Sequence, residues 1–458
     1  MGNKFIALYL QRFIRIPCPK SNTSNMKKII PFIFLMTFSL VSLAEEKTKT
    51  GYNIGGLPAV SYNSDEGFQY GAILNLFNYG DGSRFPAYNF STFLEVSRFT
   101  KGSSLYRLYF DSDQLLKGIR TFIDISYVQE DMLDFYGFNG VKSKYMTDIE
   151  ATNRVFYRMS QKQFRLLADF KGRFLIDNLN WLGSYNFFNY SPDEVDFEKL
   201  NKDVEPTDPK YLDGSSLYGN YVDWGLISAE EADGGAVHAF KAGLIYDTRK
   251  VMINPDRGIC SEALIEIAPA FLNEMPFKRY SIVHRQYHSI IKNKLNLAIR
   301  LGVQGKIGEE PIPFYRRTQL ISPFASRSNI TGLGGANSLR GIMKNRVVGD
   351  GFAFGNFELR WRALDFRLLN QNFYLGFNGF MDTGVITDEV DWNLSQLSWP
   401  GLLTYFSPDE SQTFHTTLGG GLKIGMNENF VISVDMGKAL DKRDASKTGI
   451  YININYLY

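Results

Sequence analysis

The sequence contains little of what metal-binding proteins and hydrolytic enzymes use. Its 458 residues include only 2 cysteines and 4 histidines, and no G-x-S-x-G motif, phosphate-binding loop or Cys/His cluster occurs. If the segment that carries Cys18 is removed, Cys260 has no partner for an intramolecular disulfide. His284 and His288, if they lie on a strand, are roughly 13 Å apart, which is too far for one metal ion. We therefore expect no catalytic residues, no metal and no other cofactor.

Charge imbalance and long apolar runs are also missing. Lys and Arg number 50 against 48 Asp and Glu, a net charge of +2 without a basic run, so no nucleic-acid partner is expected. Beyond residue 44 there is no run of about 18 apolar residues, the length that a transmembrane helix needs. Aromatic residues nevertheless make up 15% of the chain, while the mean hydropathy is only −0.20. Apolar and polar residues must therefore alternate finely, as in strands with one face toward lipid and one toward water.

Residues 1–44 have the order of parts that is typical of an export signal. A positive pair begins at Lys27, an apolar stretch shorter than the roughly 20 residues of a membrane-spanning helix follows, and small residues precede and include Ala44. We expect translation to start at Met26, which makes the preceding residues an N-terminal extension, and cleavage to follow Ala44. Residues 45–458 show no internal repeat or linker, so they are expected to form one domain.

Alternating polarity recurs along this domain with the period of a strand. The clearest segments are residues 88–96, 106–111, 295–304, 357–362, 430–436 and 449–458. A soluble β-sandwich also alternates, but Arg, Glu and Asp recur here in the middle of many strands, where an aqueous lumen would accommodate them. Each apolar face has about five residues, the number expected on one face of a tilted membrane strand of 9–11 residues. The sequence therefore predicts an all-β fold, a closed antiparallel transmembrane β-barrel without an exposed edge.

The connections and the last segment fit a barrel of the bacterial outer membrane. Short turns alternate with long polar stretches, at about residues 191–235 and 388–413, as periplasmic turns alternate with extracellular loops. In the last segment one face consists of Ile450, Ile452, Ile454, Tyr456 and Tyr458. Such a face resembles the C-terminal signal by which the barrel assembly machinery recognises barrels. We therefore expect outer-membrane lipid and that machinery as partners.

Three motifs, in order, resemble the barrel of the BamA/TamA family, outer-membrane assembly and secretion proteins also known as bacterial surface antigens. Residues 246–258 contain Asp-Thr-Arg and then Asn-Pro-Asp-Arg-Gly, similar to a hairpin of the family. Residues 334–342, Gly-Gly-Ala-Asn-Ser-Leu-Arg-Gly-Ile, resemble its Arg-Gly-aromatic loop motif, although Ile342 replaces the usual aromatic residue. Residues 380–384, Phe-Met-Asp-Thr-Gly, resemble its strand motif and follow a strand that carries Glu358.

The resemblance implies about sixteen strands and an extracellular loop folded into the lumen. Arg340, followed by Gly341, would lie on that loop and pair with Asp382, Glu358 or both, because both carboxylates fall on the lumen face by parity. Such a pair would act as a lumen latch, fixing the position of the loop more than adding net stability. The loop glycines Gly334 and Gly335 would permit tight turns. The alternative is an external loop with an exposed arginine.

About ten residues separate position 45 from the first strand-like segment, so the resemblance is to members without periplasmic POTRA domains. It implies a role in protein or lipid insertion or translocation at the outer membrane, with a protein or lipid substrate. The alternative is a passive porin-like channel gated by the inward-folded loop. Enzymatic function is not expected, because no nucleophile and base can be paired from the sequence.

Overall fold

The computed structural model describes residues 48–64, 66–251, 254–322, 332–368, 371–392, 394, 402–426, 430–445, 447–454 and 457–458. The expected export signal, with its start at Met26 and its cleavage after Ala44, lies outside the described residues, as does Tyr456. The compact unit Thr50–Tyr458 contains the barrel. The boundary between the signal and the barrel domain therefore stays a prediction.

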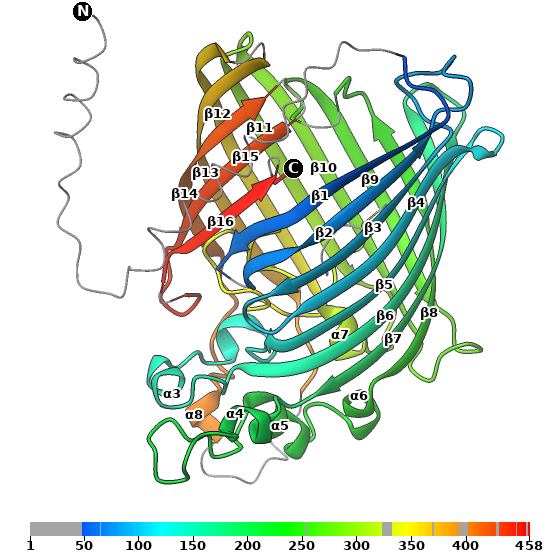
Figure 1. Ribbon diagram of the computed structural model, residues 1–458. Helices are drawn as coiled ribbons and strands as arrows, with labels where there is room; N and C mark the ends of the chain where they lie inside the picture. Colours follow the sequence, from blue (N-terminus) through cyan, green and yellow to red (C-terminus); the bar gives the residue numbers. More distant parts are fainter. Residues whose placement is uncertain are drawn as a thin grey trace, which may run out of the picture. The chain divides into compact units, whose positions relative to one another are not determined.

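Within the described residues, sixteen antiparallel strands form a closed barrel (Figure 1). They are β1 Tyr52–Asn63, β2 Gly67–Asn78, β3 Phe90–Phe99, β4 Ser104–Leu116, β5 Ile119–Asp134, β6 Arg158–Arg173, β7 Leu179–Asp193, β8 Gly235–Asp247, β9 Gly258–Ala268, β10 Phe277–Ile291, β11 Leu295–Lys306, β12 Gly351–Leu368, β13 Gln371–Asp388, β14 His415–Met426, β15 Phe430–Ala439 and β16 Gly449–Ile454. Each strand pairs with its neighbours in sequence, and β1 pairs with β16. The expected fold class is confirmed.

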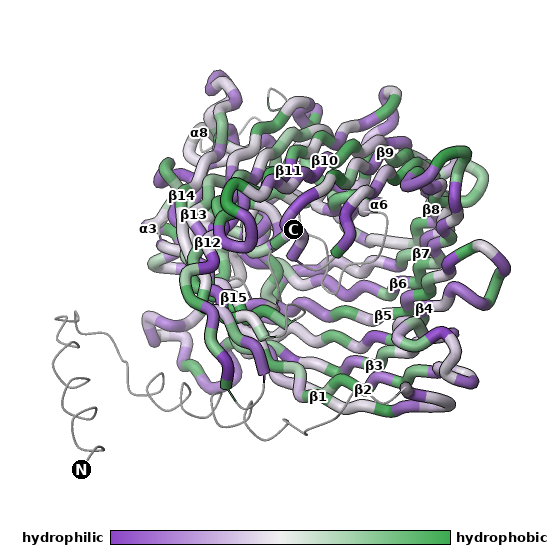
Figure 2. Tube along the Cα trace, turned by 90° about the horizontal axis from the view of Figure 1, so that it is seen from above, coloured by the Kyte–Doolittle hydropathy of each residue, from purple (hydrophilic) through white to green (hydrophobic). Residues whose placement is uncertain are grey.

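Hydrophilic and hydrophobic residues alternate along the strands (Figure 2), and the buried polar residues face the inside of the barrel. On β9, for example, Glu262 and Glu266 are buried inside the barrel, whereas Ile265 and Ile267 are exposed on its outer surface. A shift of one residue would exchange the two faces, so this pattern fixes the register of every strand. Backbone groups bond between strands, which allows the apolar face to contact lipid.

The two ends of the barrel differ in the length of their connections. At one end the connections range from two residues, between β4 and β5, to eleven residues, between β2 and β3. At the other end residues 135–157, 194–234, 307–350 and 389–414 form long connections, two of them close to the expected loops. The long loops carry η1 Gly140–Lys142, α3 Thr147–Thr152, α4 Phe197–Asn201, α5 Leu217–Asp223, α6 Ala229–Asp233, α7 Phe314–Arg317 and α8 Leu402–Tyr405. None of the described helices is long and apolar enough to cross a membrane.

A cluster of buried aromatic residues holds the long loops together at their end of the barrel. The ring of Phe135 meets Tyr218 and Tyr221 edge-on, with centroids 5.7 and 5.2 Å apart, and Tyr221 also contacts Phe406. Aromatic pairs of this geometry add about 0.5–1.5 kcal/mol each beyond their burial. The loops therefore form a packed layer, visible below the strands in Figure 1.

Candidate functional site

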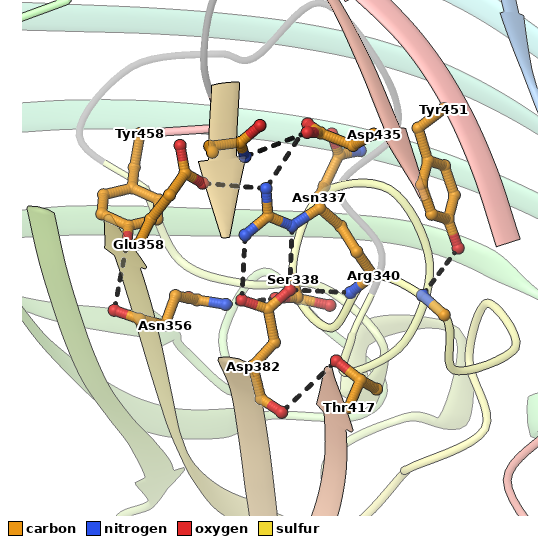
Figure 3. Close-up of polar contacts among 12 residues, drawn as sticks. Asn337, Ser338, Arg340, Asn356, Glu358, Asp382, Thr417, Asp435, Tyr451 and Tyr458 are labelled. Atoms are coloured by element: carbon orange, nitrogen blue, oxygen red, sulfur yellow. Dashed lines mark hydrogen bonds and ion pairs between the residues drawn. The ribbon is translucent and has the colours of Figure 1, made fainter. Parts of the chain in front are cut away.

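The connection between β11 and β12, residues 307–350, is here called the inward loop, because its residues bond to inward-facing side chains of the barrel. Arg340 lies at its centre and is 1% exposed. Its Nε and Nη2 donate to the two carboxylate oxygens of Asp382 on β13, at 2.9 and 3.1 Å. Its Nη1 donates to Glu358 on β12 at 2.9 Å (Figure 3). The structure thus brings together the three residues that the sequence predicts as a latch.

Further charges complete what we call the Arg340 cluster. Asp435 on β15 lies 3.4 Å from Arg340 Nη1 and accepts from Lys423 Nζ at 2.7 Å, while Arg360 donates to Glu358 at 3.0 Å. The cluster therefore contains three cations, Arg340, Arg360 and Lys423, and three anions, Glu358, Asp382 and Asp435. Balanced charge matters because an unpaired charge in a dehydrated interior is costly. The Phe380 ring also lies under the Arg340 guanidinium, 3.5 Å from its carbon atom.

Glycines let the inward loop approach the barrel wall closely. Gly341 has φ +98°, and a Cβ there would lie 2.4 Å from the backbone of Gly437 on β15. Gly334 has φ +115°, and a Cβ there would lie 2.0 Å from the Met343 carbonyl oxygen. Gly335 also has a positive φ, of +81°. An L side chain would be strained at all three positions, and at Gly334 and Gly341 it would also collide with backbone.

The loop is tied to the wall by polar contacts that carry no net charge. The Gly341 N–H donates to the hydroxyl of Tyr451 on β16 at 2.9 Å, and Asn356 Nδ2 donates to the Ser338 carbonyl at 2.6 Å (Figure 3). Ile342, where the family motif has an aromatic residue, is 1% exposed and packs with Leu339 and Phe352. The aliphatic side chain of Ile342 therefore occupies the buried position that the aromatic residue has in the family motif.

A second set of contacts, on the opposite wall, was not expected from the sequence. Lys344 Nζ donates to Glu66, between β1 and β2, at 3.1 Å and to Glu130 on β5 at 2.8 Å. Arg346 donates to the carbonyl oxygens of Gly140 and Ser143 in the loop after β5. The basic residues of the segment Lys-Asn-Arg, which begins two residues after Ile342, were the available signal, but nothing local identifies acceptors more than 200 residues away.

The contact between β1 and β16, here called the seam, is short. Among the described residues it consists of the pairs Tyr62–Ile452 and Asn63–Tyr451, whereas β1 and β2 pair from Tyr52 to Asn63. In Figure 1 the two strands run together at one end and diverge toward the other. The barrel is therefore closed most weakly at this point.

Pro58 gives one physical reason for the short seam. The N–H of Ser64 donates to the Ile450 carbonyl at 3.0 Å, and N–H groups along a strand point alternately to its two neighbours. Even-numbered residues of β1 therefore direct their N–H toward β16, and Pro58 has none to offer. Even if β1 and β16 paired along their full length, the backbone hydrogen bond at Pro58 would be missing.

The expected C-terminal signal face is only partly reproduced. Ile450 lies on the outer surface and Tyr451 on the inner one, as expected. Ile452 and Ile454 belong to β16, but Tyr456 lies outside the described residues. The expectation that Tyr458 shares the outer face is wrong. Its hydroxyl donates to the Ala298 and Asn356 carbonyls inside the barrel, both at 3.0 Å.

Histidines on the outer surface pair with hydroxyl groups of adjacent strands. Ser261 on β9 and His284 on β10 face each other, with Oγ and Nδ1 2.8 Å apart, and Tyr185 and His238 form a similar pair. In a lipid environment each polar group needs such a partner, which accounts for both pairs. Among the described residues no group of three or more His, Cys, Asp or Glu is placed to hold a metal ion. His288 lies on the same outer face of β10.

Comparisons with known proteins agree with this architecture. A model described as the Omp85 superfamily domain matches residues 100–456. BamA from Haemophilus ducreyi lacking POTRA domains 1-3 is similar in structure, with 13% identity and a TM-score of 0.53 over 98% of this chain and 81% of that chain. CdiB from Escherichia coli has 13% identity and a TM-score of 0.54 over 90% of this chain and 63% of that chain, so the chain spans less than two thirds of it. No curated protein sequence matches significantly.

Proposed function

This chain belongs to the Omp85 superfamily and is a bacterial outer-membrane barrel, and we propose that it inserts or translocates protein at the membrane through its seam. In this proposal the inward loop binds both sides of the seam from inside the barrel and keeps it closed. Protein is the substrate we commit to, because an open strand edge offers main-chain groups that another strand can pair with. The test below distinguishes a protein substrate from a lipid substrate.

One observation carries the proposal: the inward loop bonds to both sides of the seam. On one side Gly341 bonds to Tyr451 of β16 and Arg340 contacts Asp435 of β15. On the other side Lys344 bonds to Glu66, next to β1. The loop therefore supplies charge-assisted bonds where the strands supply few, and opening the seam requires those bonds to break.

The edge that opening would expose suits a substrate strand. The N–H and C=O groups of β1 from Tyr52 to Ser61 have no partner on β16 among the described residues. Exposed edges pair readily with another chain, which is why soluble proteins block them. Here Pro58 interrupts the edge, so a visiting strand can pair but lacks one bond that would hold it. Such a temporary partner suits insertion, since the substrate must leave.

The test is a disulfide across the seam, here called the seam staple, in a background that lacks both native cysteines, Cys18→Ser with Cys260→Ser. Tyr62→Cys and Ile452→Cys are oxidised to a disulfide, and Leu74→Cys with Leu94→Cys, a pair on β2 and β3, is the matched control. The barrel is reconstituted in liposomes, and the folding rate of a urea-unfolded outer-membrane barrel is measured. We expect the seam staple to reduce the acceleration about tenfold or more, and reduction to restore it.

Three results would contradict the proposal. Acceleration that survives the seam staple would separate function from the seam. Absence of acceleration together with movement of a fluorescent phospholipid would make lipid the substrate. Ion conductance that is unaffected by the staple, again without acceleration, would favour the porin-like channel gated by the same loop.

A further inference from the structure

The inner wall at β11 and β12 holds the side chain of Tyr458, the last residue of this sequence. The hydroxyl donates to two backbone carbonyls, those of Ala298 and Asn356, at 3.0 Å each. The guanidinium carbons of Arg300 and Arg360 lie 5.2 and 5.3 Å from the centre of the ring. Arg360 Nη2 also donates to the main-chain oxygen of Tyr458 at 2.8 Å. The hydroxyl group, the ring and one main-chain oxygen of the residue are thus bound.

These four wall residues, here called the tyrosine site, come from adjacent strands in register. Ala298 pairs with Glu358 and Arg300 pairs with Asn356 across β11 and β12. Carbonyl oxygens that accept a phenol and cations on the ring are specific for tyrosine: phenylalanine lacks the donor, and an aliphatic side chain lacks the negative ring face. The site therefore recognises one side chain and does not merely cover an apolar surface.

The tyrosine site shares its residues with the inward loop. Asn356 donates to the Ser338 carbonyl of the loop, while Arg300 donates to Asn356 Oδ1 at 2.7 Å and to the Asn337 carbonyl at 3.1 Å. Glu358 accepts from Arg340 of the loop and from Arg360 of the tyrosine site. Figure 3 shows Tyr458, Asn356 and Glu358 beside Arg340. A change at one position must therefore be felt at the other.

Docking of Tyr458 keeps this residue from pairing with β1. Four residues after Ile454 reach at most about 14 Å, at roughly 3.5 Å per residue. If β16 continued regularly, an even-numbered residue such as Tyr458 would point to the outer surface, like Ile450. The side chain cannot occupy both places. Binding at β11 and β12 therefore withholds the end of the chain from β1.

We propose that the tyrosine site binds Tyr458 as an internal ligand, and that its occupancy holds the inward loop in place and keeps the seam short. The ligand class is a tyrosine side chain presented by an extended segment of the same chain. When Tyr458 leaves, Arg300 and Arg360 lose contacts that position Asn356 and Glu358, and the loop loses support. This proposal concerns the state of the barrel without substrate, so it does not depend on the proposed function.

The first experiment locates residue 458 in the full-length barrel refolded into liposomes. A photoreactive 3-azidotyrosine, which keeps the hydroxyl group, replaces Tyr458, and the cross-linked peptides are identified by mass spectrometry. We expect cross-links to β11 and β12, reduced severalfold by Arg300→Gln with Arg360→Gln. Arg107→Gln is the matched control, because Arg107 is a lumen arginine on β4 that pairs with Asp124 and contacts no residue of the tyrosine site in register. Cross-links to lipid or to β1 would overturn the proposal.

The second experiment keeps natural side chains at position 458 and reads the loop. Ala336→Cys is introduced with Cys18→Ser and Cys260→Ser, and its labelling by a water-soluble maleimide is timed. We expect Tyr458→Ala to speed labelling severalfold and Tyr458→Phe to have an intermediate effect, because only the hydroxyl bonds are lost. Equal rates for Tyr458, Phe and Ala would show that occupancy does not support the loop. Because no substrate is present, failure here leaves the result of the seam staple unaffected.

Discussion

The β12–β13 hairpin and the seam are the most and least extensively paired parts of the barrel wall. β12 and β13 have 18 residues each and pair from Gly351 to Leu368, while the seam has two pairs among the described residues. Arg340 anchors the inward loop to Glu358 and Asp382 on that hairpin, and Lys344, four residues further along, bonds to Glu66 beside the seam. Because the inward loop is bound to the most extensively paired strands, β12 and β13, it can hold the least extensively paired contact, the seam, closed.

Reversing the charge of Arg340 should break the firm end of this arrangement and have the largest effect. Arg340→Asp would place a fourth anion among Glu358, Asp382 and Asp435 and leave them with too few cations. We expect a loss of about 3–5 kcal/mol in the free energy of unfolding, the cost of breaking a buried pair. Urea unfolding followed by tryptophan fluorescence and by gel mobility of the folded barrel would measure it.

Charge-swapped double variants and a control at an exposed ion pair show whether that loss comes from the buried charges. Adding Asp382→Arg or Glu358→Arg to Arg340→Asp should restore part of the stability, because a buried pair of opposite charge forms again. Arg173→Asp, at an exposed pair with Asp177, should cost about 1 kcal/mol or less. If all these variants had the same free energy of unfolding, the burial of Arg340 would not contribute to the stability of the barrel.

Gly341→Ala should displace the loop from β15 with the next largest effect. The added methyl group meets backbone at Gly437, and the residue keeps a positive φ, so we expect a loss of about 2–4 kcal/mol. Gly308→Ala, in the same loop, is the matched control, because its φ is +84° but nothing lies within 4 Å of the new Cβ. Its expected loss is about 1 kcal/mol, from backbone strain alone. Equal losses would mean that close approach to the wall is unimportant.

Lys344→Gln should loosen the seam side while leaving the Arg340 cluster intact. Glu66 and Glu130 would lose their common cation, at an expected cost of about 1–3 kcal/mol. Hydrogen exchange read by mass spectrometry should show faster exchange in β1 and β2 and unchanged exchange in β12 and β13. Faster exchange in β12 and β13 instead would show that the two ends of the loop are not independent.

The contrast between these regions also explains what the sequence could predict. Strand alternation and the local motifs around Arg340, Glu358 and Asp382 are readable because each depends on neighbours in sequence. The bonds of Lys344 to Glu66 and Glu130 cross 278 and 214 positions, and no local pattern encodes them. Tyr458 was assigned to the wrong face because parity holds only while the strand continues. The Ser261–His284 pair was missed for a related reason, since it requires the register of β9 and β10.

Pro58→Ala should have the smallest effect on stability, yet it tests the seam most directly. The new N–H can bond toward β16, a net gain of about 0.5–1.5 kcal/mol. Loss of the proline ring raises the entropy of the unfolded chain and removes about 0.4–1 kcal/mol. The free energy of unfolding should therefore hardly change, so the measurement is the local one. The rate of disulfide formation between Tyr62→Cys and Ile452→Cys should rise, because the strands spend more time paired. An unchanged rate would mean that Pro58 does not limit the seam, and that the position of Tyr458 alone must keep β16 short.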